Sequence, residues 1–112
     1  MKRIEIIIPH GGLADVHSVL KDLNVGGMSY YKIEGSGRVT ADPVVVATHP
    51  TQARPEYISR TKVEVVIKDD QVEESLSKLR ERLRGQQGGK IFVVDVPVAI
   101  DIATNKRGEE AI

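Results

Sequence analysis

The sequence predicts an α+β domain in which four strands and two helices follow one another in the order βαββαβ. Short β-branched segments occur four times, two further segments carry apolar residues at helical spacing, and glycine or proline separates most of them. A length of 112 residues fits one compact domain, so we expect residues 1–112 to form a single unit.

The first half of the chain predicts a strand, a helix and a second strand. Residues 2–8 (KRIEIII) are rich in β-branched side chains and are followed by Pro9, which indicates a strand. Residues 13–23 place leucine and valine at helical spacing, and a pair of glycines ends that unit. Residues 28–34 (MSYYKIE) are typical of a second strand.

The second half begins with a long connection and then adds a strand, a helix and a strand. Residues 35–57 contain three prolines and no helical period, which favours a functional loop. Alternation predicts a strand at residues 61–67, an apolar face predicts a helix at 72–83, and residues 90–96 (KIFVVDV) predict the last strand before a tail. This order is the split-βαβ, or ferredoxin-like, arrangement.

Both faces of the predicted sheet carry apolar side chains. Helices cover only one face in this arrangement, yet Ile7, Val66, Phe92 and Val94 have the opposite parity to the other apolar strand residues. Covering a second apolar face requires a partner, so we predict self-association. The alternative is that these side chains are tolerated at the surface.

Composition excludes several functions. Sixteen basic and sixteen acidic residues balance, so no field of one sign attracts nucleic acid or an anionic membrane. The absence of Cys excludes disulfides and thiolate sites, and the three histidines lack metal-ligand spacing, so we predict no metal site. One Phe, three Tyr and no Trp offer little for base stacking. We therefore expect a cytoplasmic domain without a nucleic-acid partner and without catalytic residues.

Two glycine-rich segments are candidates for phosphate binding. Gly35 and Gly37 follow the second strand, and Gly88-Gly89-Lys90 lead into the fourth. Glycine lets backbone N–H groups approach a phosphate, and a lysine supplies a point charge. The alternative is that these are ordinary turn glycines beside a solvated cation.

Several motifs together resemble the PII signal-transduction family. They are Gly35-x-Gly37-Arg38, the sequence DDQV at residues 69–72, GKIFV at 89–93 and the terminal GEEAI at 108–112. The likeness covers the chain outside about residues 39–58. It implies a homotrimer with adenine-nucleotide sites in the clefts between subunits. It also implies three named segments: a T-loop at residues 37–57, a B-loop at 85–90 and a C-terminal segment at 97–112.

The resemblance assigns the nucleotide site residue by residue. Ile7, Glu64 and Val66 would wall the adenine pocket, Ser29 would lie near the base, and the glycine segments with their cations would hold the phosphates. The complete implied set is Ile7, Ser29, Gly35, Ser36, Gly37, Arg38, Glu64, Val66, Gly88, Gly89 and Lys90.

Departures from the family pattern modify this expectation. The B-loop is shorter, and Asp101 and Ala103 replace two arginines that usually bind phosphate, although Lys106 and Arg107 offer compensating charge. Val39 replaces a glutamine that helps bind Mg²⁺ and 2-oxoglutarate. We therefore expect AMP or ADP to bind better than Mg-ATP, with weak or absent 2-oxoglutarate sensing. The role of Mg²⁺ stays open.

The T-loop is the expected contact with a target protein. Its apolar run Val44, Val45 and Val46, together with Arg54, would bind the partner. One possible partner is a membrane transporter, which would bring the protein to a membrane. The run could instead pack on its own trimer. Alternative functions are a sensor of bicarbonate or cyclic AMP, or a PII-shaped protein that has lost nucleotide binding. An acylphosphatase-like enzyme is disfavoured because residues 9–12 (PHGG) lack arginine.

Overall fold

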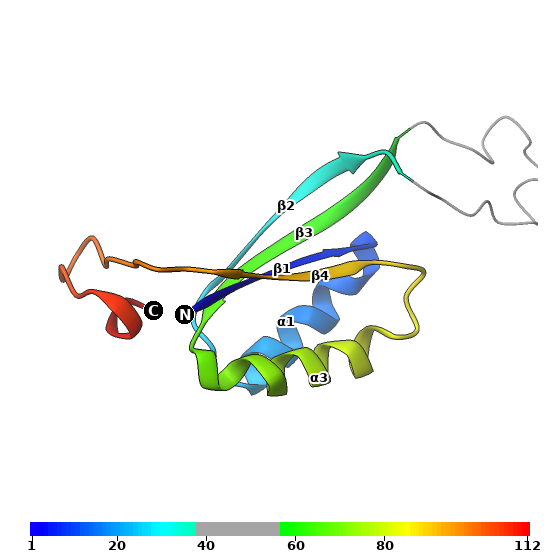
Figure 1. The fold of residues 1–112 in the computed structure, drawn as a ribbon. Coiled ribbons are helices and arrows are strands. Elements are labelled where there is room, and N and C mark those ends of the chain that lie inside the picture. Colours follow the sequence, from blue (N-terminus) through cyan, green and yellow to red (C-terminus); the bar gives the residue numbers. More distant parts are fainter. Residues whose placement is uncertain (38–56) are drawn as a thin grey trace, which may run out of the picture.

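The computed structural model describes residues 1–37 and 57–112, and it confirms the α+β class with two helices beside a four-stranded antiparallel sheet (Figure 1). The strands are β1 (Lys2–Ile8), β2 (Met28–Gly35), β3 (Ile58–Ile67) and β4 (Lys90–Asp95). The helices are α1 (Leu13–Asp22) and α3 (Val72–Leu83). Strand β3 begins three residues earlier than the alternation predicts, because Ile58 pairs with Gly35 at the end of β2.

The strands are arranged in the order β2-β3-β1-β4. Strand β1 lies in the interior, where Ile4 is opposite both Val65 of β3 and Val93 of β4. Strands β2 and β3 continue together past the end of β1 toward residues 35–58 (Figure 1). Within the described residues, β2 and β4 form the two free edges of the sheet.

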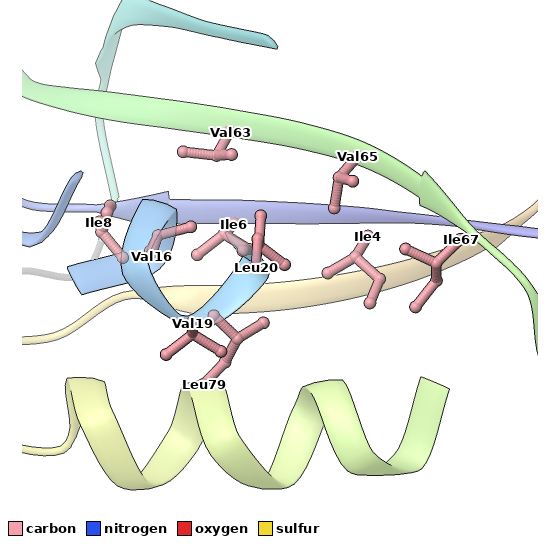
Figure 2. Packing of buried hydrophobic residues seen from close by; sticks show 10 residues of the cluster. All are labelled: Ile4, Ile6, Ile8, Val16, Val19, Leu20, Val63, Val65, Ile67 and Leu79. Atoms are coloured by element: carbon pink, nitrogen blue, oxygen red, sulfur yellow. The ribbon is translucent and has the colours of Figure 1, made fainter. Parts of the chain in front are cut away.

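Both helices lie on the same side of the sheet, and the core fills the space between the two layers (Figure 1). The core side chains come from alternate positions of β1 and β3, as the pleat of a strand requires. Figure 2 shows them facing Val16, Val19 and Leu20 of α1 and Leu79 of α3. The buried strand residues are Ile4, Ile6, Ile8, Val63, Val65 and Ile67.

The opposite, helix-free face of the sheet is mixed in character. It carries apolar Ile7, Val66 and the half-exposed Phe92 and Val94. Charged side chains of β1 and β3 also lie on this face, at the positions that alternate with the buried ones. The apolar positions agree with the sequence parity, but they share the face with an ionic network described below.

Short 3₁₀ turns introduce the helices. One at His10–Gly12 precedes α1, and one at Asp69–Gln71 precedes α3. Acidic residues in the first turn of α3 and arginines in its last turn suit the helix dipole. No helix in residues 1–37 or 57–112 has the length and apolar character needed to cross a bilayer.

The C-terminal segment is ordered rather than a simple tail. Ile100 and Arg107 form an isolated antiparallel bridge, and the Gly108 amide donates to the Ala99 carbonyl at 2.9 Å. A final 3₁₀ turn at Gly108–Ala111 follows. Local hydrogen bonds of this kind give no periodic signal in a sequence, which is why the sequence predicted only a tail here.

Candidate functional site

A cavity of about 350 Å³ brings together three of the predicted base-pocket residues. Ser29 and Glu64 are directly opposite each other on β2 and β3, and Val66 follows two residues later on the same face. Alternation along the two strands explains this proximity, since residues two apart share a face. The cavity therefore has one hydroxyl, one carboxylate and one apolar wall at neighbouring positions.

Two residues of the C-terminal segment line this cavity. Ala111 and Ile112 line it together with Gly26 and Gly27 from the loop between α1 and β2. A Cβ at Gly26 would lie 3.7 Å from the Ile112 backbone carbon, which is ordinary contact. The sequence pointed to the C-terminal segment in general but not to these two residues. Their contact depends on the turn between Ile100 and Arg107, which returns the chain.

A second cluster forms where the B-loop enters β4. Lys90 lies directly opposite Ile7 of β1, and Gly89 precedes it with a φ of +136°. A Cβ at Gly89 would lie only 2.8 Å from the Ile7 carbonyl oxygen, so this position needs glycine for both space and conformation. Gly88 also has a positive φ, of +80°.

A groove of about 800 Å³ borders the B-loop on its helix side. Gly88, Gly89 and Lys90 line it together with Arg80 and Arg84 from α3. Its floor is apolar, formed in part by Leu76, Leu83, Ile91 and Val93. Cations from the loop and from α3 thus border the same hollow, and these are suitable groups for attracting an anionic ligand.

The remaining predicted residues lie elsewhere. Gly35 is opposite Ile58, beyond the point where β1 ends with Ile8 opposite Thr61, and Ser36 and Gly37 follow it. They line neither of the two cavities above. Ile7, which was also predicted to wall the base pocket, lies opposite Lys90 and does not line the cavity of Ser29, Glu64 and Val66. One chain therefore places that cavity, the B-loop cluster with Ile7, and the glycine segment after β2 at three separate positions. Arg38, Val44, Val45, Val46 and Arg54 lie outside the described residues.

An ionic network crosses the helix-free face next to Glu64. Lys62 Nζ lies 3.4 Å from Glu5 Oε2 and 3.6 Å from Glu64 Oε1, and Arg3 Nη2 lies 2.9 Å from Glu5 Oε1. The hydrogen bond from Arg3, with help from Lys62, lowers the pKa of Glu5 below its usual range. Burial opposes the charge of Lys62, but Tyr31 and Glu5 outweigh that effect and raise the pKa of Lys62.

Tyr31 joins this network from β2. Its hydroxyl donates to Glu64 Oε1 at 3.1 Å, and Lys62 Nζ lies 6.0 Å from the centre of its ring. The sequence analysis did not single out Tyr31 or Lys62. Their parity with Ser29 and Glu64 was visible in the sequence, but the pairing of Tyr31 with Lys62 depends on the strand register.

His10 connects the turn after β1 to the beginning of β3. Its Nδ1 lies 2.6 Å from Thr61 Oγ1, and its Nε2 lies 2.8 Å from Ser59 Oγ. Thr61 is buried, whereas His10 and Ser59 are exposed. Both ring nitrogens are thus used within the protein, and among the described residues no three His, Asp or Glu side chains gather as a metal site.

The Asp101 side chain accepts hydrogen bonds from the backbone of its own turn. Its Oδ1 accepts from the backbone N–H groups of Ala103 and Thr104, each at 2.9 Å. The backbone hydrogen bond from Thr104 is the main reason that the pKa of Asp101 is lowered. Lys106 and Arg107 follow in the same turn, are exposed and line neither cavity described above.

Comparison with known proteins gives a consistent result. A family model described as "Nitrogen regulatory protein P-II" matches residues 1–106. The chain is 33% identical to the nitrogen regulatory protein P-II of Pasteurella multocida and 32% identical to that of Haemophilus influenzae, with full coverage of both chains in each case. It is 31% identical, again over the full length of both, to nitrogen regulatory protein P-II 1 of Escherichia coli.

Proposed function

The chain belongs to the P-II family of nitrogen regulatory proteins, and from that premise we propose that it is a non-catalytic sensor that binds an adenine nucleotide. The observation that carries the proposal is the cavity in which Ser29, Glu64 and Val66 meet. A hydroxyl and a carboxylate beside an apolar wall suit a flat base that has polar groups at its edge.

The B-loop cluster supplies the phosphate half of the proposed site. Gly88 and Gly89 have positive φ angles, and because they lack side chains a ligand can approach the loop backbone directly. Lys90 adds a cation at the same place. Backbone N–H groups in such loops and a lysine ammonium are common partners of phosphate.

We propose that two copies of the chain complete each site. The base pocket and the B-loop cluster occupy separate positions in one chain, so a neighbouring copy could bring one half to the other. Among the described residues, the edges of β2 and β4 are unpaired, and these edges and the apolar side chains of the helix-free face support association of copies. The resemblance implies that this assembly is a homotrimer and that its T-loop binds a target protein.

We further propose that AMP or ADP binds better than Mg-ATP and that the response to 2-oxoglutarate is weak. Asp101 is already engaged with the amides of Ala103 and Thr104, and Ala103 has no polar side chain. These two positions therefore contribute no cation to a triphosphate. Fewer positive partners favour the less highly charged nucleotides.

Isothermal titration calorimetry tests the proposal. The panel is AMP, ADP, ATP and cyclic AMP, each with and without Mg²⁺, 2-oxoglutarate and bicarbonate. We expect AMP or ADP to bind at one site per chain and Lys90→Ala to weaken that binding roughly 10-fold or more, as for a hydrogen bond to a charged group. Lys21→Ala is the matched control, because Lys21 is an exposed lysine on α1, outside both cavities.

Each other outcome has a defined meaning. Tight, Mg²⁺-dependent cooperation between ATP and 2-oxoglutarate would contradict the predicted preference. Selective binding of cyclic AMP, or a requirement for bicarbonate, would replace the proposed signal with one of those molecules. No binding by any nucleotide would mean that the site has been lost and that the proposal is wrong.

A further inference from the structure

Glu64 is held by two side chains that lie outside the lining of its cavity. The Tyr31 hydroxyl donates to Oε1 at 3.1 Å, and Lys62 Nζ lies 3.6 Å from the same oxygen. Neither Tyr31 nor Lys62 lines the cavity, whereas Glu64 does. Both contacts are made to Oε1, so among the described residues Oε2 is left to accept a hydrogen bond from a ligand.

The strand register explains why Glu64 needs such support. Glu64 is directly opposite Glu5 on β1, and two carboxylates at opposed positions repel each other. Lys62 Nζ lies within 3.6 Å of an oxygen of each carboxylate and offsets that repulsion. Tyr31 of β2, which is paired with Lys62 of β3, adds a directional hydrogen bond that restrains the Glu64 carboxylate.

We propose that Tyr31 and Lys62 are positioning residues that make the base pocket selective for a purine with an exocyclic amino group. This inference rests on the proposed function, because it concerns the same cavity. An ionised carboxylate only accepts hydrogen bonds, so a fixed Oε2 favours the amino group of adenine. It disfavours hypoxanthine, which has a carbonyl at that position and would place two acceptors against each other.

Replacing Tyr31 or Lys62 is expected to change how well the pocket discriminates between ADP and inosine diphosphate, and not to change folding. If Tyr31 holds the carboxylate, its hydroxyl improves binding of ADP while contributing little to binding of inosine diphosphate. Loss of one hydrogen bond in a protein corresponds to roughly 3- to 10-fold in an equilibrium constant. The readout is therefore the ratio of the two affinities.

The chain offers a matched control for the tyrosine. Tyr30 is adjacent on β2, has its side chain on the opposite face and is 59% exposed, compared with 45% for Tyr31. Tyr30→Phe removes the same atom as Tyr31→Phe from the same strand without touching Glu64. Lys32, two residues after Tyr30 and on the same face as Tyr30, is the corresponding control for Lys62.

The experiment measures binding of ADP and of inosine diphosphate by calorimetry, with thermal unfolding as a check on folding. We expect Tyr31→Phe to weaken ADP roughly 3- to 10-fold, to change inosine diphosphate much less, and to leave the unfolding midpoint close to that of the unaltered protein. Tyr30→Phe should leave the ratio unchanged. Lys62→Met should lower the preference for ADP over inosine diphosphate more than Tyr31→Phe does, and Lys62→Arg should restore part of that preference. Lys32→Met should leave the preference unchanged.

Two results would overturn the inference in distinguishable ways. If the unaltered protein binds ADP but Tyr31→Phe leaves the ratio unchanged, or weakens both ligands equally, the positioning role is wrong and the proposed function stands. If the unaltered protein binds no adenine nucleotide, the proposed function fails and the positioning role fails with it. Should Lys62→Met not fold, Tyr31→Phe and its control still decide the question.

Discussion

At the scale of single residues, Gly89 shows most directly how the backbone shapes the candidate site. Its φ of +136° lies in a region that residues with side chains rarely adopt, and the Ile7 carbonyl oxygen lies 2.8 Å from the place of a Cβ, closer than real Cβ contacts. The close approach of the B-loop to β1 is therefore possible because this residue has no side chain. That approach sets the start of β4 and hence the position of Lys90 opposite Ile7.

We predict that Gly89→Ala destabilises the protein by about 1–3 kcal/mol, because the new methyl group meets backbone rather than a flexible side chain. Urea unfolding followed by circular dichroism measures the change. Gly85→Ala is the control in the same loop, since Gly85 has no atom within 4 Å of an added Cβ and no positive φ. Equal stability of the two variants would show that the B-loop moves away without cost.

Individual site residues were predictable to different degrees. Ser29, Glu64 and Val66 were assigned by resemblance and line one cavity, whereas Ile7, assigned with them, lies opposite Lys90 outside it; their role in binding stays a proposal. Tyr31 and Lys62 were not assigned, because their contact with Glu64 follows from the register between β2 and β3. That register depends on two segments that are far apart in the sequence. The same reason applies to Ala111 and Ile112.

At the scale of elements, α3 contributes one fully buried hydrophobic residue, Leu79, to a core that comes mainly from the sheet and α1. Leu79 points from α3 toward α1 (Figure 2). Leu76, three residues earlier, instead borders the groove near the B-loop. An ion pair between Arg82 and Asp15 at 2.9 Å also joins the two helices, but at an exposed position where such pairs contribute little.

Leu79→Ala is expected to cost about 2–5 kcal/mol in free energy of unfolding, the usual range for emptying a buried leucine site. Leu76→Ala should cost clearly less, because Leu76 is only partly buried. Chemical denaturation of both variants gives the comparison. Similar losses would indicate that the groove beside α3 is closed in solution.

The elements were predicted well where periodicity is strong and less well elsewhere. Strands β1 and β2 and both helices agree with the sequence expectation to within a residue at each end. The first residues of β3 were missed because their strand character comes from pairing with β2 and not from alternation. The turn at residues 100–107 was missed because it depends on the Asp101 carboxylate and on one isolated bridge.

At the scale of the whole molecule, the two faces of the sheet have different partners. The helices cover one face, and the helix-free face combines an ionic network with the exposed apolar side chains of Phe92 and Val94. In the proposed homotrimer this face and the free strand edges meet other copies. Charged groups on such a surface would determine the register between copies as well as adding attraction.

We predict that light scattering gives a mass close to three times the 12.3 kDa of one chain. Phe92→Lys should shift the mass downward and weaken ADP binding together, since a charge would then lie in a buried interface. Val93→Lys is the matched control for the mass alone, because Val93 is adjacent, is 42% exposed compared with 46% for Phe92, and lies on the helix side, where it lines the groove beside the B-loop. If Val93→Lys lowered the mass and Phe92→Lys did not, the interface would lie on the helix side of the sheet, and the predicted interface on the helix-free face would be wrong.

The interior position of β1 has a consequence for synthesis of the chain. This strand leaves the ribosome before both of its partners, which are residues 61–67 and 90–95, and Lys2 is opposite Asp95. Both hydrogen-bonding edges of an isoleucine-rich strand therefore remain open until most of the chain has been translated. Nascent chains of this protein are expected to be most vulnerable to aggregation, and most dependent on chaperones, just before the last strand emerges.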